Sequence, residues 1–302
     1  MSISNNNENI NEYPVLIIGG SLVGLSVSMF LAMHGIKSLI IEKHQGTAIH
    51  PRAGYFQLRT LEMLRQAGIE DKVIKAAHAL YDPNGGMNAV ETLAGREIAN
   101  YIPDINQGIQ DLTPVRRLFM PQQVLEPIIK DRAKELGSAF LYAHKVNNFS
   151  QDEQGVYLEA EHIDDKSKKS FRGRYLIACD GSRSPVRNQL GIKMNGYPVM
   201  SQSITVYFKA DCSKALRGRN LGVIYVNNEN VRGFFRLEKT CSFLTKNSAC
   251  LTERFLLTII FASLILSGTL TKHLACPEVN NPSEIIFFIS SGKPASLSVL
   301  AI

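Results

Sequence analysis

A glycine-rich turn follows the first strongly apolar run of the chain. The turn, Gly19-Gly20-Ser21-Leu22-Val23-Gly24, lies between Val15–Ile18 and a second apolar stretch, Leu22–Met33. Glycine at the first position permits a tight turn, and glycine at the last permits close packing of a helix on a strand. A helix that begins here presents free amides and a positive dipole end to phosphate. We therefore predict a dinucleotide site that includes Gly19, Gly20, Ser21, Val23 and Gly24.

An acidic residue stands where such a site needs one. Glu42, followed by Lys43, ends the apolar run Ser38–Ile41 and comes 23 residues after Gly19. A carboxylate at this place accepts hydrogen bonds from ribose hydroxyls, so both residues join the predicted site. Ser21 replaces the usual second glycine and is small enough to preserve close approach of a phosphate.

Two other interpretations apply to the same turn. It could be a glycine-rich turn that serves only close packing. It could also resemble the nucleophile elbow G-x-S-x-G, but Val23 stands where that pattern requires glycine. The sequence therefore disfavours the hydrolase interpretation.

The surrounding patterns predict the elements that position this turn. Val15–Ile18, Leu22–Met33 and Ser38–Ile41 form a strand–helix–strand unit, with Gly35 ending the helix. Further helices are expected at Phe56–Gln66, Asp71–Leu80 and Gln122–Leu136, with Gly68 and Gly137 as stops. Strands are expected at Phe140–Val146 and Val156–His162, then a polar turn at Asp164–Lys169 and a buried strand at Tyr175–Cys179. A separate antiparallel sheet is expected from Ser203–Lys209, Val223–Val226 and Gly233–Leu237.

Composition narrows the class of protein. The 302 residues are 45% hydrophobic and 20% charged, with a net charge of +6 and no dense Lys/Arg block, so we expect no nucleic-acid partner. The five cysteines form no CxxC pair and have no ligand spacing with histidine. We expect them to be reduced, in a cytoplasmic protein without a metal site.

The two ends of the chain differ from its middle. The polar residues 1–12 are expected to be a disordered lead-in and resemble no signal peptide. From Cys241 to Ile302 there is no Asp and no Tyr, and the periodicity is lost, so this tail is predicted to be a foreign sequence and not a continuation of the same domain. Its uncharged run Phe255–Leu270 is slightly short for a membrane span, which makes membrane attachment the less favoured alternative.

Four ordered blocks, within residues 14–240, resemble the FAD-dependent aromatic and polyketide hydroxylases related to p-hydroxybenzoate and phenol hydroxylase. The blocks are the segment VLIIGGSLVGLSVSMFLAMHGIKSLIIEKH, the segment HPRAGYFQLRTLEMLRQAGIED, QQVLEP and YLIACDGSRSPVR.

The resemblance implies roles for residues outside the first turn. Arg52 resembles the family arginine that contacts the flavin nucleotide, and Gln122 resembles a glutamine beside the FAD. Asp180 and Gly181 resemble the Asp-Gly motif that serves FAD and NADPH, completed by Ser184 and Arg187. The implied cofactor is FAD with NADPH or NADH as reductant, and the implied substrate is a small aromatic or polyketide ring. No residue is assigned as catalytic, because in this chemistry the protein binds and orients while the cofactor reacts.

The sequence also departs from that family. A second motif with a Gly-Asp dipeptide is expected after the sheet, and the chain contains no Gly-Asp. We therefore expect an α/β fold of the p-hydroxybenzoate hydroxylase type with an incomplete antiparallel substrate sheet. Its parts are an FAD-binding domain at 13–195, with substrate-domain residues inserted around 82–116, a partial sheet at 196–240 and the tail 241–302.

For the isolated chain we expect weak ADP-type binding, low activity and a tendency to aggregate. The alternatives are a non-catalytic nucleotide-binding remnant and an NAD(P)-dependent dehydrogenase.

Overall fold

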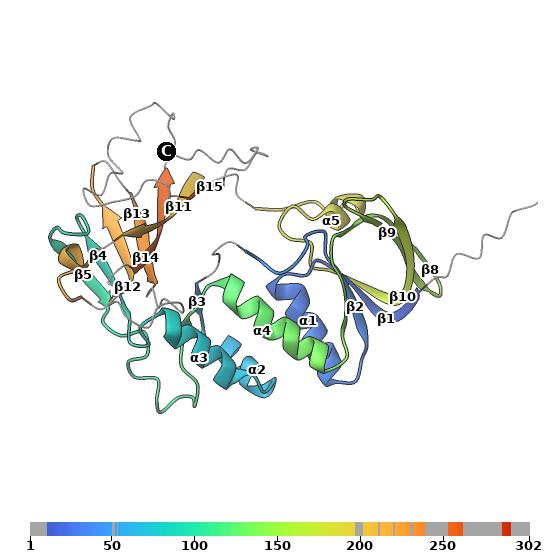
Figure 1. Cartoon of the computed structure of the whole chain (residues 1–302), viewed down its shortest axis with the longest axis horizontal. Coiled ribbons are helices and arrows are strands. Elements are labelled where there is room, and N and C mark those ends of the chain that lie inside the picture. Colours follow the sequence, from blue (N-terminus) through green and yellow to red (C-terminus); the bar gives the residue numbers. More distant parts are fainter. Residues whose placement is uncertain are drawn as a thin grey trace, which may run out of the picture. The chain divides into compact units, whose positions relative to one another are not determined.

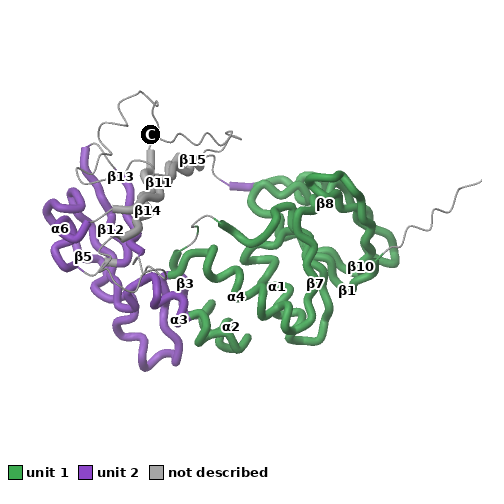
Figure 2. The backbone as a smooth tube through the Cα atoms, in the orientation of Figure 1, with its two compact units in different colours: residues 1–55, 59–73, 120–194 green, residues 56–58, 74–119, 195–302 purple. Residues whose placement is uncertain are grey.

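The computed structural model divides into two compact units (Figure 2). Unit 1 contains residues 1–55, 59–73 and 120–194, and unit 2 contains residues 56–58, 74–119 and 195–302. The structure describes residues 11–49, 52, 54–196, 202–210, 212–219, 221–229, 232–238, 253–261 and 286–290. Of these, residues 202–210, 221, 253–261 and 286–290 are described by their backbone alone.

Unit 1 is built on a six-stranded sheet of order β7-β2-β1-β10-β9-β8 (Figure 1). Its strands are β1 (Asn11–Ile18), β2 (Ser38–Ile41), β7 (Ala139–Leu141), β8 (His144–Asp152), β9 (Gly155–His162) and β10 (Lys168–Ala178). The pairs β7–β2, β2–β1 and β1–β10 are parallel, whereas the pairs β10–β9 and β9–β8 are antiparallel. The helices are α1 (Leu22–Met33), α2 (Leu58–Gln66), α4 (Gln122–Glu135) and α5 (Pro185–Gln189). Helix α3 (Glu70–Leu80) and the two-stranded sheet of β3 (Tyr55–Phe56) and β6 (Leu118–Phe119) contain residues of both units.

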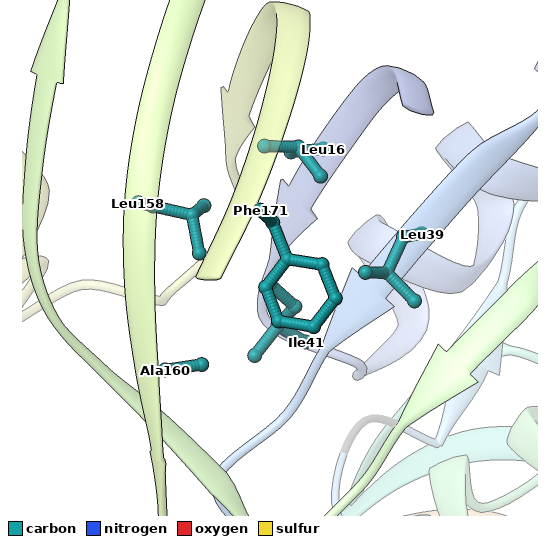
Figure 3. Close-up of a cluster of buried hydrophobic side chains, with 6 residues drawn as sticks. All are labelled: Leu16, Leu39, Ile41, Leu158, Ala160 and Phe171. Atoms are coloured by element: carbon teal, nitrogen blue, oxygen red, sulfur yellow. The ribbon is translucent and has the colours of Figure 1, made fainter. Parts of the chain in front are cut away.

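A cluster of apolar side chains joins the parallel and antiparallel parts of this sheet. Figure 3 shows Phe171 of β10 between side chains from β1 and β2 and those from β9. The members of the cluster are Leu16, Leu39, Ile41, Leu158, Ala160 and Phe171, all of them buried. Burial of this apolar surface stabilises the packing of β1, β2 and β10, which end beside the glycine-rich turn.

Helix α1 packs closely on the sheet because its buried side includes small residues. Gly24, Ser28 and Ala32 recur at every fourth position and are all buried. The Ser28 hydroxyl lies 2.7 Å from that of Ser38 at the start of β2 and 2.8 Å from that of Ser138 just before β7. These bonds satisfy hydroxyls that burial would otherwise leave unpaired.

Unit 2 contains a seven-stranded sheet of order β15-β11-β14-β13-β12-β4-β5. The strands are β4 (Gly86–Val90), β5 (Glu97–Ile102), β11 (Gln202–Ala210), β12 (Leu221–Asn227), β13 (Arg232–Glu238), β14 (Glu253–Phe261) and β15 (Ile286–Ser290). The short helix α6 (Ser213–Leu216) contributes Leu216 to a buried cluster with Val90, Ile224 and Val226. The expected strands lie in this sheet, and its pairs are antiparallel except that β12 pairs parallel with β4.

The structure confirms the first strand–helix–strand unit and corrects two later strands. The expected strand Phe140–Val146 is two strands, because Ala143 takes a positive φ of 56° and turns the chain between β7 and β8. The expected polar turn ends earlier, since β10 already begins at Lys168. Tyr175–Cys179 is not a buried strand: β9 pairs with β10 only as far as Gly173, and Tyr175 is 59% exposed. Beyond that point, among the strands that the structure describes, β10 pairs with β1 alone.

The ends of the chain also differ from expectation. Strand β1 begins at Asn11, where pairing with Phe171 orders two residues of the expected lead-in, and residues 1–10 lie outside the described part. Strand β14 lies beyond Thr240 in the same sheet as β13, and the boundary at 240 stays a prediction. The apolar run Phe255–Leu270 is a strand as far as Phe261, and its remainder lies outside the described residues. Within the described part of the chain, no helix has the length and apolar character needed to cross a membrane.

Candidate nucleotide-binding site

The glycine-rich turn lies at the carboxyl end of β1, where the chain enters α1. A Cβ at Gly19 would lie 2.3 Å from the carbonyl oxygen of Cys179, and Gly19 has a φ of +103°. A Cβ at Gly24 would lie 1.9 Å from the carbonyl oxygen of Gly19. Both positions therefore require glycine, and the turn is held tightly between α1 and the end of β10.

The amino-terminal end of helix α1 carries backbone amides for which the helix itself offers no acceptor. Ser21 is its N-cap residue, and the first helical bond runs from the Leu25 amide to the Ser21 carbonyl at 2.9 Å. Helix geometry leaves the amides of Val23 and Gly24 without acceptors inside the helix. The Val23 side chain is 64% exposed, so this end of the helix is open to an anionic ligand.

Glu42 supports the turn from the end of β2. Its Oε2 accepts a hydrogen bond from the Gly20 amide at 2.6 Å, and its Oε1 accepts one from the His44 amide at 2.9 Å. The carboxylate is buried, whereas the neighbouring Lys43 is exposed. Each oxygen retains a lone pair for a further donor, so the geometry is compatible with the predicted bond to ribose.

Glu126 of α4 is a site residue that sequence reasoning missed. Its side chain is fully buried, and its Oε1 accepts bonds from the Ser21 hydroxyl at 2.6 Å and the Leu22 amide at 3.0 Å. Gln122 donates through Nε2 to the same oxygen at 2.6 Å, and the Ala48 amide donates to Oε2 at 2.6 Å. The available signal was an acidic residue on the apolar side of a predicted helix, between Leu125 and Ile129. Glu126 thus fixes the start of α1, α4 and the loop after β2 to one another.

The structure also brings the predicted arginine and glutamine segments together. The Gln122 amide donates to the Arg52 carbonyl at 2.9 Å, and the Met120 amide donates to the Gly54 carbonyl at 3.1 Å. The Gln122 side chain additionally donates to the Ser21 hydroxyl at 2.7 Å. Gln122 therefore links the exposed Arg52 to the glycine-rich turn, because its backbone amide bonds to Arg52 and its side chain bonds to Ser21.

The Asp-Gly segment comes directly after β10. Asp180 accepts a hydrogen bond from the Val186 amide at 3.1 Å, and Ser184 accepts one from the Arg187 amide at 3.0 Å. Arg187 donates to the Ser182 carbonyl at 2.9 Å, and Gly181 is exposed with a φ of +92°. This segment joins the site through Cys179, which lies against Gly19. Ser184 and Arg187 stabilise the turn after β10, and among the described residues they make no hydrogen bond to the glycine-rich turn.

Two titratable side chains near the turn are held in their neutral forms. Burial raises the pKa of Tyr142 to about 12, helped by the negative charges of Glu126 and Glu42. Burial also raises the pKa of the Cys179 thiol, with a smaller contribution from Asp180. Cys179 is therefore not activated as a thiolate nucleophile, and its place against Gly19 is one of packing.

The residues gathered here suit the ADP part of a dinucleotide. Amides at a helix start, a carboxylate at the next strand end and a glycine-lined approach meet at the carboxyl ends of parallel strands, where open α/β sheets bind ligands. In the described part of the chain, no group of three or more His, Cys, Asp or Glu side chains is arranged to hold a metal ion.

Comparison with known proteins identifies the family. The family described as "FAD binding domain" matches residues 12–262, which includes every predicted site residue and extends past Thr240. This match favours an FAD-binding domain over the plain nicotinamide dehydrogenase considered above.

Curated relatives include monooxygenases of small rings and of polyketides. The chain is 49% identical over 229 residues to a 4-methyl-5-nitrocatechol 5-monooxygenase of Burkholderia sp., covering 76% of this chain and 42% of that protein. It is 33% identical over 255 residues to the tetracenomycin A2 monooxygenase-dioxygenase of Streptomyces glaucescens, covering 77% of this chain and 44% of that protein. The chain thus spans less than half the length of these relatives.

Solved structures agree with the predicted fold. A ternary complex of aklavinone-11 hydroxylase with FAD and aklavinone superposes with a TM-score of 0.73 at 26% identity, covering 85% of this chain and 46% of that one. The flavin-dependent monooxygenase PieE, in complex with FAD and substrate, gives 0.72 at 27% identity, with 86% and 45% covered. The p-hydroxybenzoate hydroxylase type of fold is therefore confirmed, and the chain belongs to the family of FAD-binding domains found in aromatic and polyketide hydroxylases.

Proposed function

We propose that unit 1 binds the ADP part of FAD, with the pyrophosphate at the start of α1 and the ribose at Glu42. The observation that carries this proposal is the convergence of three other segments on the glycine-rich turn. They are Glu42, the Arg52–Gln122 pair and the Asp180 segment. Arg52 supplies positive charge for phosphate, and Asp180 with Gly181 lines the side of the turn formed by β10.

The reaction proposed for the protein is hydroxylation of an aromatic ring with O2 and NADPH or NADH. Bound and reduced FAD would supply the oxygen-activating chemistry, and the residues of this chain bind and orient the cofactor. The nitrocatechol monooxygenase is the relative at 49% identity, whereas the tetracenomycin enzyme is at 33%. We therefore propose a monocyclic phenolic substrate rather than a polyketide. From the composition of the chain we also propose a cytoplasmic protein with no nucleic-acid partner.

Flavin binding tests the proposal directly. The purified 302-residue chain is titrated with FAD, FMN and ADP, and bound flavin is followed by its absorbance and by quenching of its fluorescence. We expect FAD to bind, ADP to compete with it and FMN, which lacks the adenosine part, to bind much more weakly. If ADP fails to compete, the proposed placement of the adenosine part is wrong. Oxygen-dependent NADPH consumption would contradict the expectation of low activity but not that of binding.

A further inference from the structure

The sheet of unit 2 carries a buried cation on the face opposite its apolar cluster. Phe235 and Leu237 of β13 pack against the cluster that contains Val90, Ile224 and Leu216. Side chains alternate between faces along a strand, so Phe234, Arg236 and Glu238 share the other face. Arg236 and Glu238 are only 6% and 3% exposed, which is unusual for charged residues.

In the part of the chain that the structure describes, one edge of the Arg236 guanidinium has no hydrogen-bond acceptor. Nε and Nη2 are both buried, and neither has a hydrogen-bond partner among the described residues. These two nitrogens carry the parallel N–H pair with which arginine binds two oxygens of a planar anion. Buried donors in native proteins are nearly always satisfied, so these two nitrogens point to a ligand that accepts from them.

The nearest acceptor is held away from that edge. Glu238 Oε1 lies 3.7 Å from Nη2, which is too far for a hydrogen bond. The same Oε1 accepts a bond from the Tyr81 hydroxyl at 2.7 Å, and the Arg236 guanidinium lies 5.8 Å from the centre of the Tyr81 ring. Tyr81 thus holds the carboxylate beside the guanidinium while leaving the donor pair open.

Aromatic side chains adjoin this charged pair on the same face. Phe234 lies two residues before Arg236 and pairs directly with Tyr225 of β12, with ring centres 6.0 Å apart. Tyr225 also meets the Tyr101 ring edge to face at 6.1 Å. An aromatic ligand could therefore pack its ring on this surface and direct its polar groups at Arg236 and Glu238.

We propose that Arg236 and Glu238 bind the monoanion of a catechol-type substrate. The ionised oxygen would accept from Nε and Nη2 of Arg236, and the neighbouring hydroxyl would donate to Glu238. A bare carboxylate fits less well because it would face the Glu238 charge without a proton to donate. This inference rests on the proposed hydroxylation of a phenolic ring, and it assigns the residues that recognise that ring.

Two probes separate charge recognition from ring packing. 4-Nitrocatechol ionises near neutral pH and changes its visible spectrum when it does, whereas 1,2-dimethoxy-4-nitrobenzene cannot ionise. Equilibrium dialysis of the 302-residue chain with each probe gives the two affinities. We expect the nitrocatechol to bind more tightly and with the spectrum of its anion. Equal affinity for both probes would overturn the proposal without any variant.

Variants then assign the preference to one side chain. Arg236→Met should weaken nitrocatechol binding roughly 10- to 100-fold, the loss expected for hydrogen bonds to a charged group, and leave the dimethoxy compound unchanged. Arg232→Met is the matched control, because Arg232 is exposed on the same strand and should have no effect. Arg236→Lys keeps a cation beside Glu238 but removes the planar donor pair. Arg236→Lys should show the same selective loss, and it provides the test if Arg236→Met does not fold.

Two results would contradict the assignment of Arg236. One is an equal loss of both probes in the Arg236 variants, and the other is unchanged affinity for nitrocatechol in folded Arg236→Lys. FAD binding is measured on the same samples. If the unsubstituted chain does not bind FAD but still binds nitrocatechol selectively, the proposed function is wrong. The proposed anion site would then still stand.

Discussion

Replacing Glu126 by Gln tests whether this buried carboxylate holds the nucleotide-binding turn together. Its two oxygens accept four hydrogen bonds, and the glutamine amide can accept only those made to one oxygen. Turning its NH2 group toward the Ala48 amide places two donors face to face, at a cost of about 1.5–3 kcal/mol for the lost charged bond. Each of the other three bonds weakens by about 0.5–1 kcal/mol, because the acceptor becomes neutral. The total is about 3–6 kcal/mol.

Urea unfolding followed by far-ultraviolet circular dichroism measures this loss. The expected decrease in the unfolding midpoint is on the order of 1–2 M. Glu135→Gln is the matched control on the same helix, because Glu135 is half exposed and pairs only at the surface with Arg132 and Lys72. ADP affinity should fall in Glu126→Gln and stay unchanged in the control. Coincident unfolding curves for the two variants would refute the reasoning.

Three further predictions concern the turn and the pH dependence of stability. Gly24→Ala should abolish ADP binding because its Cβ would meet a backbone oxygen at 1.9 Å, whereas Gly46→Ala, with open space around it, should bind normally in the same titration. The pKa of Tyr142 is raised to about 12, so its contribution to stability is present below pH 10 and is lost as the pH rises through 12. Tyr142→Phe should therefore lose less stability over that range in alkaline denaturation, and an equal loss would contradict the assignment. The hydrogen bond from Arg172 lowers the pKa of Asp152, so the stability it contributes is present above about 3.8 and is lost as the pH falls further. Acid unfolding of Asp152→Asn should converge with that of the wild type at low pH, and a difference that persists there would have another cause.

The local sequence was sufficient to predict those elements whose geometry depends only on the spacing of nearby residues. The turn and helix α1 were predicted at the residues where they occur, and the first strand was predicted over its buried half, Val15–Ile18. The apolar runs and the steric demands of Gly19 and Gly24 act within a few residues. The place of Glu42 beside the turn was predictable for the same reason, since the strand that carries it has a fixed place in this type of unit.

The errors fall where a property depends on neighbours distant in sequence. Tyr175 lies in an apolar segment that suggested burial, yet β9 stops pairing at Gly173 and leaves that side chain exposed. No local pattern shows where a neighbouring strand ends. The parallel pairing of β12 with β4 was missed likewise, because it joins segments that lie far apart along the chain.

The sequence by itself determined the type of fold and the glycine-rich loop for which nucleotide binding is proposed. Only the tertiary structure decided what holds that loop, because Glu126 lies 105 residues from Ser21 and meets it through the packing of α4 beside α1. The same is true of Arg236: its charge is visible in the sequence, but its burial and its open donor edge arise from strands brought together by folding. Hydrogen bonds and burial depend on distances in space, and the order of residues fixes those distances only within one element.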